Sequence, residues 1–144
     1  MRLILAPMQG LVDDVMRDVL TRIGGFDACV SEFVRVTHTV HGRGMWIKLV
    51  SELEHNAQTF AGIDCTVQIL GSDAENMALN ALEALKYGAK KIDINFGCPA
   101  PTVNRHQGGS VLLREPQRIE HIVQTVRAAL PEHIPLSAKM RLGY

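Results

Sequence analysis

Cys98 is the residue in this sequence whose type and setting best suit chemistry. It lies in the run Asn95-Phe96-Gly97-Cys98-Pro99, directly after a short apolar segment. Glycine and proline on either side predict a tight turn at the end of a buried strand. A free thiol has a pKa of about 8.5, so it stays protonated near neutral pH and can donate a proton. The local motif alone leaves an alternative open, a partly buried loop cysteine.

Other polar side chains interrupt apolar segments in the same way. They are Glu32, Gln68, Asn95, Lys139 and Arg141. A polar group inside an apolar strand costs roughly 2–7 kcal/mol unless it finds a partner. Several of them near strand ends therefore predict one shared ligand site. Each alone also fits a structural role, such as capping a strand, forming a turn or reaching solvent.

The segments that must position these residues alternate between strand and helix. Apolar runs predict strands over 3–6, 28–33, 65–70, 92–96 and 136–142. Apolar residues at helical spacing predict helices over 12–23, 72–88 and 116–130, with a short helix over 46–53 inside a long irregular excursion. Ser72 followed by Glu75 predicts a capping box at the start of the second of these helices.

Alternating strands and helices predict an α/β protein with a parallel sheet. An open doubly wound sheet and a TIM barrel both fit this order. Polar side chains at the ends of several strands favour the TIM (β/α)8 barrel, where catalytic residues come from the carboxyl ends of different strands. Such a barrel has eight strands and about 250 residues. We therefore expect residues 1–144 to be the N-terminal part, about five strands, of one truncated barrel domain.

Composition excludes several classes of protein. With 15 basic and 15 acidic residues the net charge is zero, so composition gives no overall attraction to nucleic acid. No apolar run is long enough to span a membrane, and the N-terminal run is too short for a signal peptide, so we expect a cytoplasmic protein. Cys29, Cys65 and Cys98 are far apart, which predicts neither a disulfide framework nor a metal site. We interpret the first two as buried core thiols.

Five segments resemble the tRNA-dihydrouridine synthase family, and most closely its bacterial C branch. They are Leu5-Ala6-Pro7-Met8-Gln9-Gly10, Ser31-Glu32-Phe33-Val34-Arg35-Val36, Val67-Gln68-Ile69-Leu70-Gly71, Asp93-Ile94-Asn95-Phe96-Gly97-Cys98-Pro99 and Lys139-Met140-Arg141-Leu142-Gly143. They occur in the family's order and cover essentially the whole chain.

The resemblance implies reduction of the 5,6 double bond of a uridine in tRNA, with FMN as cofactor and NADPH as reductant. It implies that hydride passes to C6 of the base and that Cys98 protonates C5. The implied flavin contacts are Pro7, Met8, Gln9, Gln68 and Lys139. The implied substrate contacts are Asn95, Arg141 and Arg35, although Arg35 also fits a pairing with Glu32 or a loop. We expect no metal, no membrane contact and a monomer when full length.

The chain departs from the family's usual pattern after the cysteine. Pro101 stands where a lysine is common, and Arg105 and His106 stand where smaller residues are common. The two cationic residues fit either a solvated loop or phosphate contacts. Trp46 fits either an anchor for the excursion or a stacking platform for a base.

Two other functions stay open at this stage. The chain could belong to another FMN-dependent barrel oxidoreductase that acts on a small pyrimidine. It could also be an inactive half-barrel. Phosphate sites of TIM barrels usually lie on the loops after strands seven and eight. We therefore expect the isolated chain to bind FMN weakly or not at all.

Overall fold

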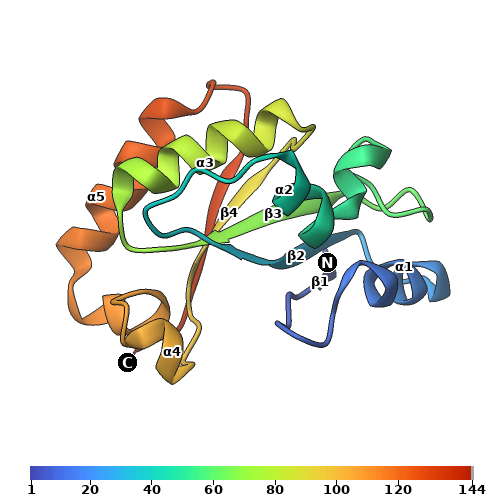
Figure 1. The fold of residues 1–144 in the computed structure, drawn as a ribbon. Coiled ribbons are helices and arrows are strands. Elements are labelled where there is room, and N and C mark those ends of the chain that lie inside the picture. The colour runs from blue at the N-terminus through green and yellow to red at the C-terminus, as the bar shows by residue number, and fades with distance from the viewer. Residues whose placement is uncertain (144) are drawn as a thin grey trace.

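The computed structural model describes residues 1–143, which form one parallel five-stranded sheet with the strands in chain order (Figure 1). The strands are β1 Ile4–Leu5, β2 Ala28–Arg35, β3 Cys65–Leu70, β4 Ile92–Phe96 and β5 Leu136–Met140. Every neighbouring pair is parallel. The predicted α/β fold is thereby confirmed as a half-barrel, the N-terminal part of a TIM barrel. The expected boundaries needed small corrections, because β2 runs two residues further and β5 ends two residues earlier.

The helices are α1 Asp14–Ile23, α2 Arg43–Leu49, α3 Ala74–Lys86, α4 Pro101–Asn104 and α5 Pro116–Ala129. Two 3-10 helices, Ser51–His55 and Gly109–Arg114, complete the list. The single helix expected over 46–53 is therefore wrong: α2 ends at Leu49 and the 3-10 turn follows. The loop expected after Cys98 contains α4, which Pro101 opens at a first-turn position that needs no N–H donor.

Helix α3 packs its small side chains toward the sheet and lies beside α5 (Figure 1). Met77, Ala81 and Ala84 are fully buried along it. The expected capping box is wrong by one residue, because Asp73 is the N-cap and its Oδ1 accepts the N–H of Asn76 at 3.0 Å. An aspartate carboxylate satisfies this donor as a serine hydroxyl would, so both residues fit the position.

Helix α1 presents its apolar side chains outward among the described residues. Met16, Val19 and Ile23 are exposed, whereas Arg17 and Thr21 are buried. The apolar spacing correctly predicted a helix here. The face that meets the rest of the described chain is nevertheless polar, and it is held by a buried ion pair.

Trp46 anchors the excursion between β2 and β3. Its side chain is fully buried, and its indole Nε1 donates to the carbonyl of His41 at 3.0 Å. The interpretation as an anchor is confirmed. Among residues 1–143, no helix is both long and apolar enough to cross a membrane.

The concave side of the sheet encloses a hollow of about 470 Å³ that touches all five strands. Each strand supplies at least one residue that lines the hollow, among them Ile4, Val30, Thr66, Asp93 and Ser137. The sheet therefore curves as part of a barrel wall, and the carboxyl ends of its strands converge at one rim.

Candidate functional site

The turn that carries Cys98 is built by Asn95. This residue is the last but one of β4, and its side-chain Oδ1 accepts the backbone N–H of Gly97 at 2.9 Å and of Cys98 at 3.0 Å. Two donors on one amide oxygen hold the chain in a tight turn and leave the Cys98 side chain half-buried. The turn-forming role considered for Asn95 is thereby confirmed.

Behind this turn lies a chain of buried polar side chains. The Asn95 Nδ2 donates to the Gln68 Oε1 at 2.8 Å, and the Gln68 Nε2 donates to the Asp93 Oδ2 at 2.6 Å. The Ser137 hydroxyl completes the chain by donating to the Asp93 Oδ1 at 2.6 Å. Gln68 is 0% exposed, so its side chain pairs with other side chains and does not cap a strand backbone.

Two cationic side chains reach the turn from the end of β5. The Arg141 Nε donates to the carbonyl oxygen of Gly97 at 2.7 Å. A Cβ on Gly97 would lie 3.8 Å from the Lys139 Nζ. Lys139 lies in β5 and Arg141 directly follows its last residue, and both side chains lie beside the cysteine turn.

The segment after α4 closes on the cysteine from the other side. The Ser110 N–H donates to the Cys98 carbonyl at 2.9 Å. Gly109 has a φ of +67°, and a Cβ there would lie 2.5 Å from the Cys98 carbonyl oxygen. Only glycine fits this combination of left-handed backbone and close approach.

These features surround a cavity of about 260 Å³. The residues lining it are Pro7, Met8, Gln9, Phe33, Gln68, Asn95, Gly97, Cys98, Pro99, Lys139 and Arg141. The structure therefore brings together every predicted site residue except Glu32 and Arg35. Gln9 is fixed at the rim, where its Oε1 accepts the N–H of Phe33 at 3.2 Å.

Arg35 and Glu32 lie outside this cavity. Arg35 lines a neighbouring cavity of about 380 Å³, which also touches Cys98, and its Nη2 donates to the carbonyl of Thr102 at 3.2 Å. The Glu32 carboxylate accepts the N–H of Gly10 after β1. The prediction that Glu32 joins the shared site is therefore wrong, because its carboxylate holds a loop. Arg35 contacts a carbonyl of α4 and not Glu32.

The cavity's side chains fit a flat aromatic ring with polar edges, such as that of a flavin. Pro7 and Met8 offer apolar surface. The Gln68 Nε2 keeps a second hydrogen beyond the one given to Asp93. Lys139 supplies a positive charge that would stabilise an anionic ring. Across residues 1–143 no group of three metal-ligating side chains occurs.

Sequence reasoning missed Asp93, the residue at the base of the polar chain. It is 6% exposed and lies between Ile92 and Ile94, which are fully buried, in β4. A carboxylate at such a position needs a partner, which was the available signal. The loop residues that depart from the family pattern, Arg105 and His106, are both exposed, in keeping with a solvated loop.

Cys29 and Cys65 lie opposite each other on β2 and β3, and both are buried. A hydrogen bond between the Cys65 thiol and Cys29, followed by burial, raises the pKa of the Cys65 thiol well above its usual value. The Cys65 thiol therefore stays protonated near neutral pH. Because both cysteines are buried, the interpretation as core thiols is confirmed. Cys98 is the cysteine that is half-accessible.

A curved parallel sheet with a cysteine, two amides and two cations at the carboxyl rim defines this chain as part of a TIM-barrel protein with its site at that rim. The sequence model of the dihydrouridine synthase (Dus) family matches residues 4–144. The chain belongs to this family.

Curated relatives agree with the family match. A tRNA-dihydrouridine(16) synthase of Neisseria meningitidis serogroup B is 71% identical over 143 residues, which are 99% of this chain and 43% of the relative. Proteins of the same name from Pseudomonas putida and Vibrio cholerae are 52% and 47% identical, each over 100% of this chain and 45% of the relative. The chain thus spans less than half the length of these relatives.

Proposed function

We propose that this chain is the cysteine-bearing part of an FMN-dependent tRNA-dihydrouridine synthase that uses NADPH and reduces uridine 16 of tRNA. The observation that carries the proposal is the single cavity that Cys98 shares with Gln68, Asn95, Lys139 and Arg141. The relatives' names supply the substrate and the position. We place residues 1–144 within one barrel domain of a longer, monomeric, cytoplasmic protein.

In this proposal Cys98 holds the proton that the uracil ring receives at C5. FMN, when bound, would supply the hydride that goes to C6. Cys98 is half-buried, which lets a base reach its Sγ while limiting water. The target base must leave the tRNA stack to reach it. A correctly placed general acid contributes about 10²–10⁴-fold to a rate.

The remaining residues would orient the cofactor and the base. Pro7, Met8 and Gln9 would line the flavin, with Gln68 and Lys139 at its polar edge. The Asn95 Oδ1 is engaged by the turn, so Asn95 would offer the base the second hydrogen of Nδ2. Arg141 gives Nε to Gly97 and would offer its Nη atoms to a uracil carbonyl. Arg35, in the cavity next to Cys98, would contact RNA outside the target base.

A second candidate is an FMN-dependent oxidoreductase that acts on a small pyrimidine. One observation favours it: the net charge of zero. RNA binding depends on neutralising phosphates with lysine and arginine. Under the first proposal the remainder of the longer protein would supply that charge.

The test uses the longest natural form of the protein, supplied with FMN and NADPH, and compares its activity on RNA with its activity on small substrates. Unmodified tRNA, free uridine and orotate are offered separately. Mass spectrometry measures dihydrouridine at each position of the tRNA and the reduced form of each small pyrimidine. The proposal predicts reduction of tRNA at position 16 alone. Turnover of the small pyrimidines without RNA would favour the second candidate.

A further inference from the structure

We propose that Asp93 is a positioning residue for Cys98, acting through the buried amides of Gln68 and Asn95. This inference rests on the proposed function for its effect on turnover. The arrangement itself is independent of it, because it is seen in four consecutive hydrogen bonds from Ser137 to the backbone of Cys98.

Asp93 lies on the central one of the three strands that carry the polar chain. It is in register with Gln68 on β3 and with Ser137 on β5, so it faces a residue on each neighbouring strand. Its Oδ1 accepts from the Ser137 hydroxyl and its Oδ2 from the Gln68 Nε2, both at 2.6 Å. Short contacts of this kind are typical of hydrogen bonds to an ionised carboxylate.

The carboxylate determines which way both amides point. An ionised carboxylate only accepts hydrogen bonds, so Gln68 must turn its Nε2 toward Asp93 and its Oε1 toward Asn95. Asn95 must then present its Nδ2 to Gln68, which turns its Oδ1 toward the N–H groups of Gly97 and Cys98. If either amide were reversed, two acceptors or two donors would face each other in a buried setting.

This orientation matters because Asn95 is the support of the turn on its N–H side. Arg141 holds the Gly97 carbonyl and Ser110 holds the Cys98 carbonyl. Without the correct amide orientation the turn would keep its carbonyl contacts and lose its N–H contacts. The Sγ would then move relative to a base in the cavity, and small misplacements of this kind cost about 10²-fold in rate.

The chemistry of the chain predicts a specific pattern of variants. In Asp93→Asn, the new amide can keep its oxygen toward Gln68 and turn its nitrogen toward the Ser137 hydroxyl, which can accept. Asp93→Asn is therefore expected to retain most of the turnover. In the double variant Asp93→Asn with Ser137→Ala that acceptor is gone, so the amide orientation is no longer determined. The double variant and Asp93→Ala should both lose about 10–100-fold in kcat.

Two readouts separate positioning from general damage. The first is kcat and KM of the longest natural form on tRNA; positioning predicts a fall in kcat with little change in KM. The second is the rate of iodoacetamide labelling at Cys98 in this chain without flavin or RNA. The labelling rate of Cys98 in the double variant should differ at least threefold from its labelling rate in Asp93→Asn. The matched control is Asp64→Asn, which changes a carboxylate to an amide at an ion pair with Lys91 outside the cavity. Its kcat should be unchanged.

The outcomes distinguish this inference from the proposed function. If Asp93→Asn loses as much kcat as Asp93→Ala, or if the double variant matches Asp93→Asn in both readouts, Asp93 does not act through the amides. If Asp93→Ala does not fold, as judged by circular dichroism, the comparison of the double variant with Asp93→Asn still decides. A wild-type protein that makes no dihydrouridine overturns the proposed function, and the labelling rates still test the amide chain.

Discussion

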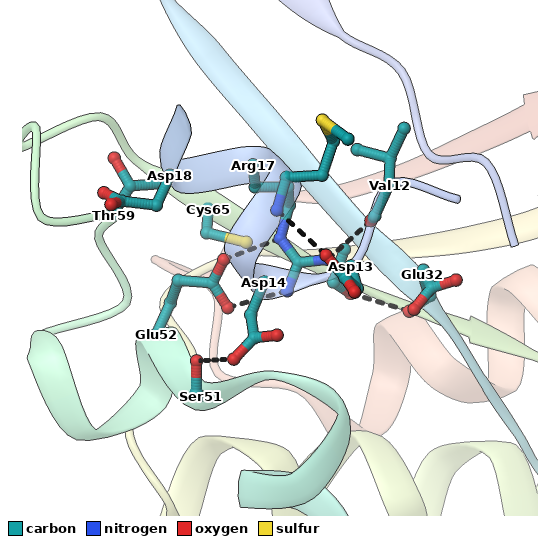
Figure 2. A network of polar contacts seen from close by, with 12 residues as sticks. Val12, Asp13, Asp14, Arg17, Asp18, Glu32, Ser51, Glu52, Thr59 and Cys65 are labelled. Carbon is teal, nitrogen blue, oxygen red and sulfur yellow. Dashed lines mark hydrogen bonds and ion pairs between the residues drawn. The ribbon is translucent and has the colours of Figure 1, made fainter. Parts of the chain in front are cut away.

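Replacing Arg17 by methionine should destabilise the chain more than any surface change, because it leaves a buried carboxylate without its cation. Arg17 on α1 is 0% exposed, and Glu52 in the 3-10 turn is 3% exposed. The guanidinium Nε and Nη2 bond the two Glu52 oxygens at 2.6 and 2.8 Å, and Nη1 donates to the Val12 carbonyl at 2.9 Å (Figure 2). The Ser51 hydroxyl adds a bond to Asp14 beside this pair.

The expected loss of stability is large because Arg17 and Glu52 are both buried. Burial alone lowers the pKa of Arg17, but the hydrogen bonds and charge of Glu52 outweigh it and raise the pKa above its ordinary value. The arginine is thus charged at every accessible pH. Breaking a buried pair by removing one partner costs about 3–5 kcal/mol. A typical domain has only about 5–15 kcal/mol of stability in total.

Urea unfolding followed by the fluorescence of Trp46 measures this loss, since it is the only tryptophan and is fully buried. Arg17→Met should lower the free energy of unfolding by about 3–5 kcal/mol. Arg17→Met combined with Glu52→Leu should recover much of it, because no unpaired charge remains. A loss below about 1 kcal/mol, the range of exposed pairs, would refute the reasoning. So would a double variant no more stable than the single one.

Three further predictions concern the site's surroundings. Gly109→Ala should lower the free energy of unfolding by about 1–3 kcal/mol, because the residue has a left-handed φ and an added Cβ would clash with Cys98. The control in urea unfolding is Gly44→Ala, whose added Cβ meets nothing within 4 Å. Iodoacetamide should label Cys98 alone in the native chain and all three cysteines in urea, as counted by mass spectrometry. A second label on the native chain would contradict the burial of Cys29 and Cys65. The pKa of Asp64 lies below its ordinary 3.8, chiefly because Lys91 donates a hydrogen bond to the carboxylate. The ion pair therefore stabilises the fold above that pH, and this stabilisation is lost on further acidification. The stability difference between wild type and Asp64→Asn should shrink in urea titrations below that pH, and a constant difference would argue against the pair.

Much of the site was predictable because its residues break an apolar pattern near strand ends. Gln68, Asn95, Lys139 and Arg141 stand out this way, and strand geometry then brings them to one rim. Asp93 breaks the same pattern but was read as part of a strand, since its partners are 25 and 44 residues away in sequence. Only the register of the neighbouring strands reveals that it supports the cysteine turn.

The face of α1 shows a second limit of sequence reasoning. Its apolar spacing predicts a helix but not which side meets the rest of the described chain. Arg17 is buried because Glu52, 35 residues away, comes to meet it. The cap of α3 shows a third limit, because Ser72 and Asp73 both fit an N-cap and only the backbone geometry selects Asp73. Four-residue α4 has too few residues to carry a periodic signal.

The central claim, that Cys98 donates the proton, is tested most directly by Cys98→Ala in the longest natural form of the protein. FMN is reduced with NADPH, unmodified tRNA is added in excess, and flavin absorbance follows a single turnover. We predict that the variant retains its flavin and reduces tRNA about 10²–10⁴-fold more slowly than wild type. A Cys98→Ala protein that makes dihydrouridine at the wild-type rate would contradict the claim.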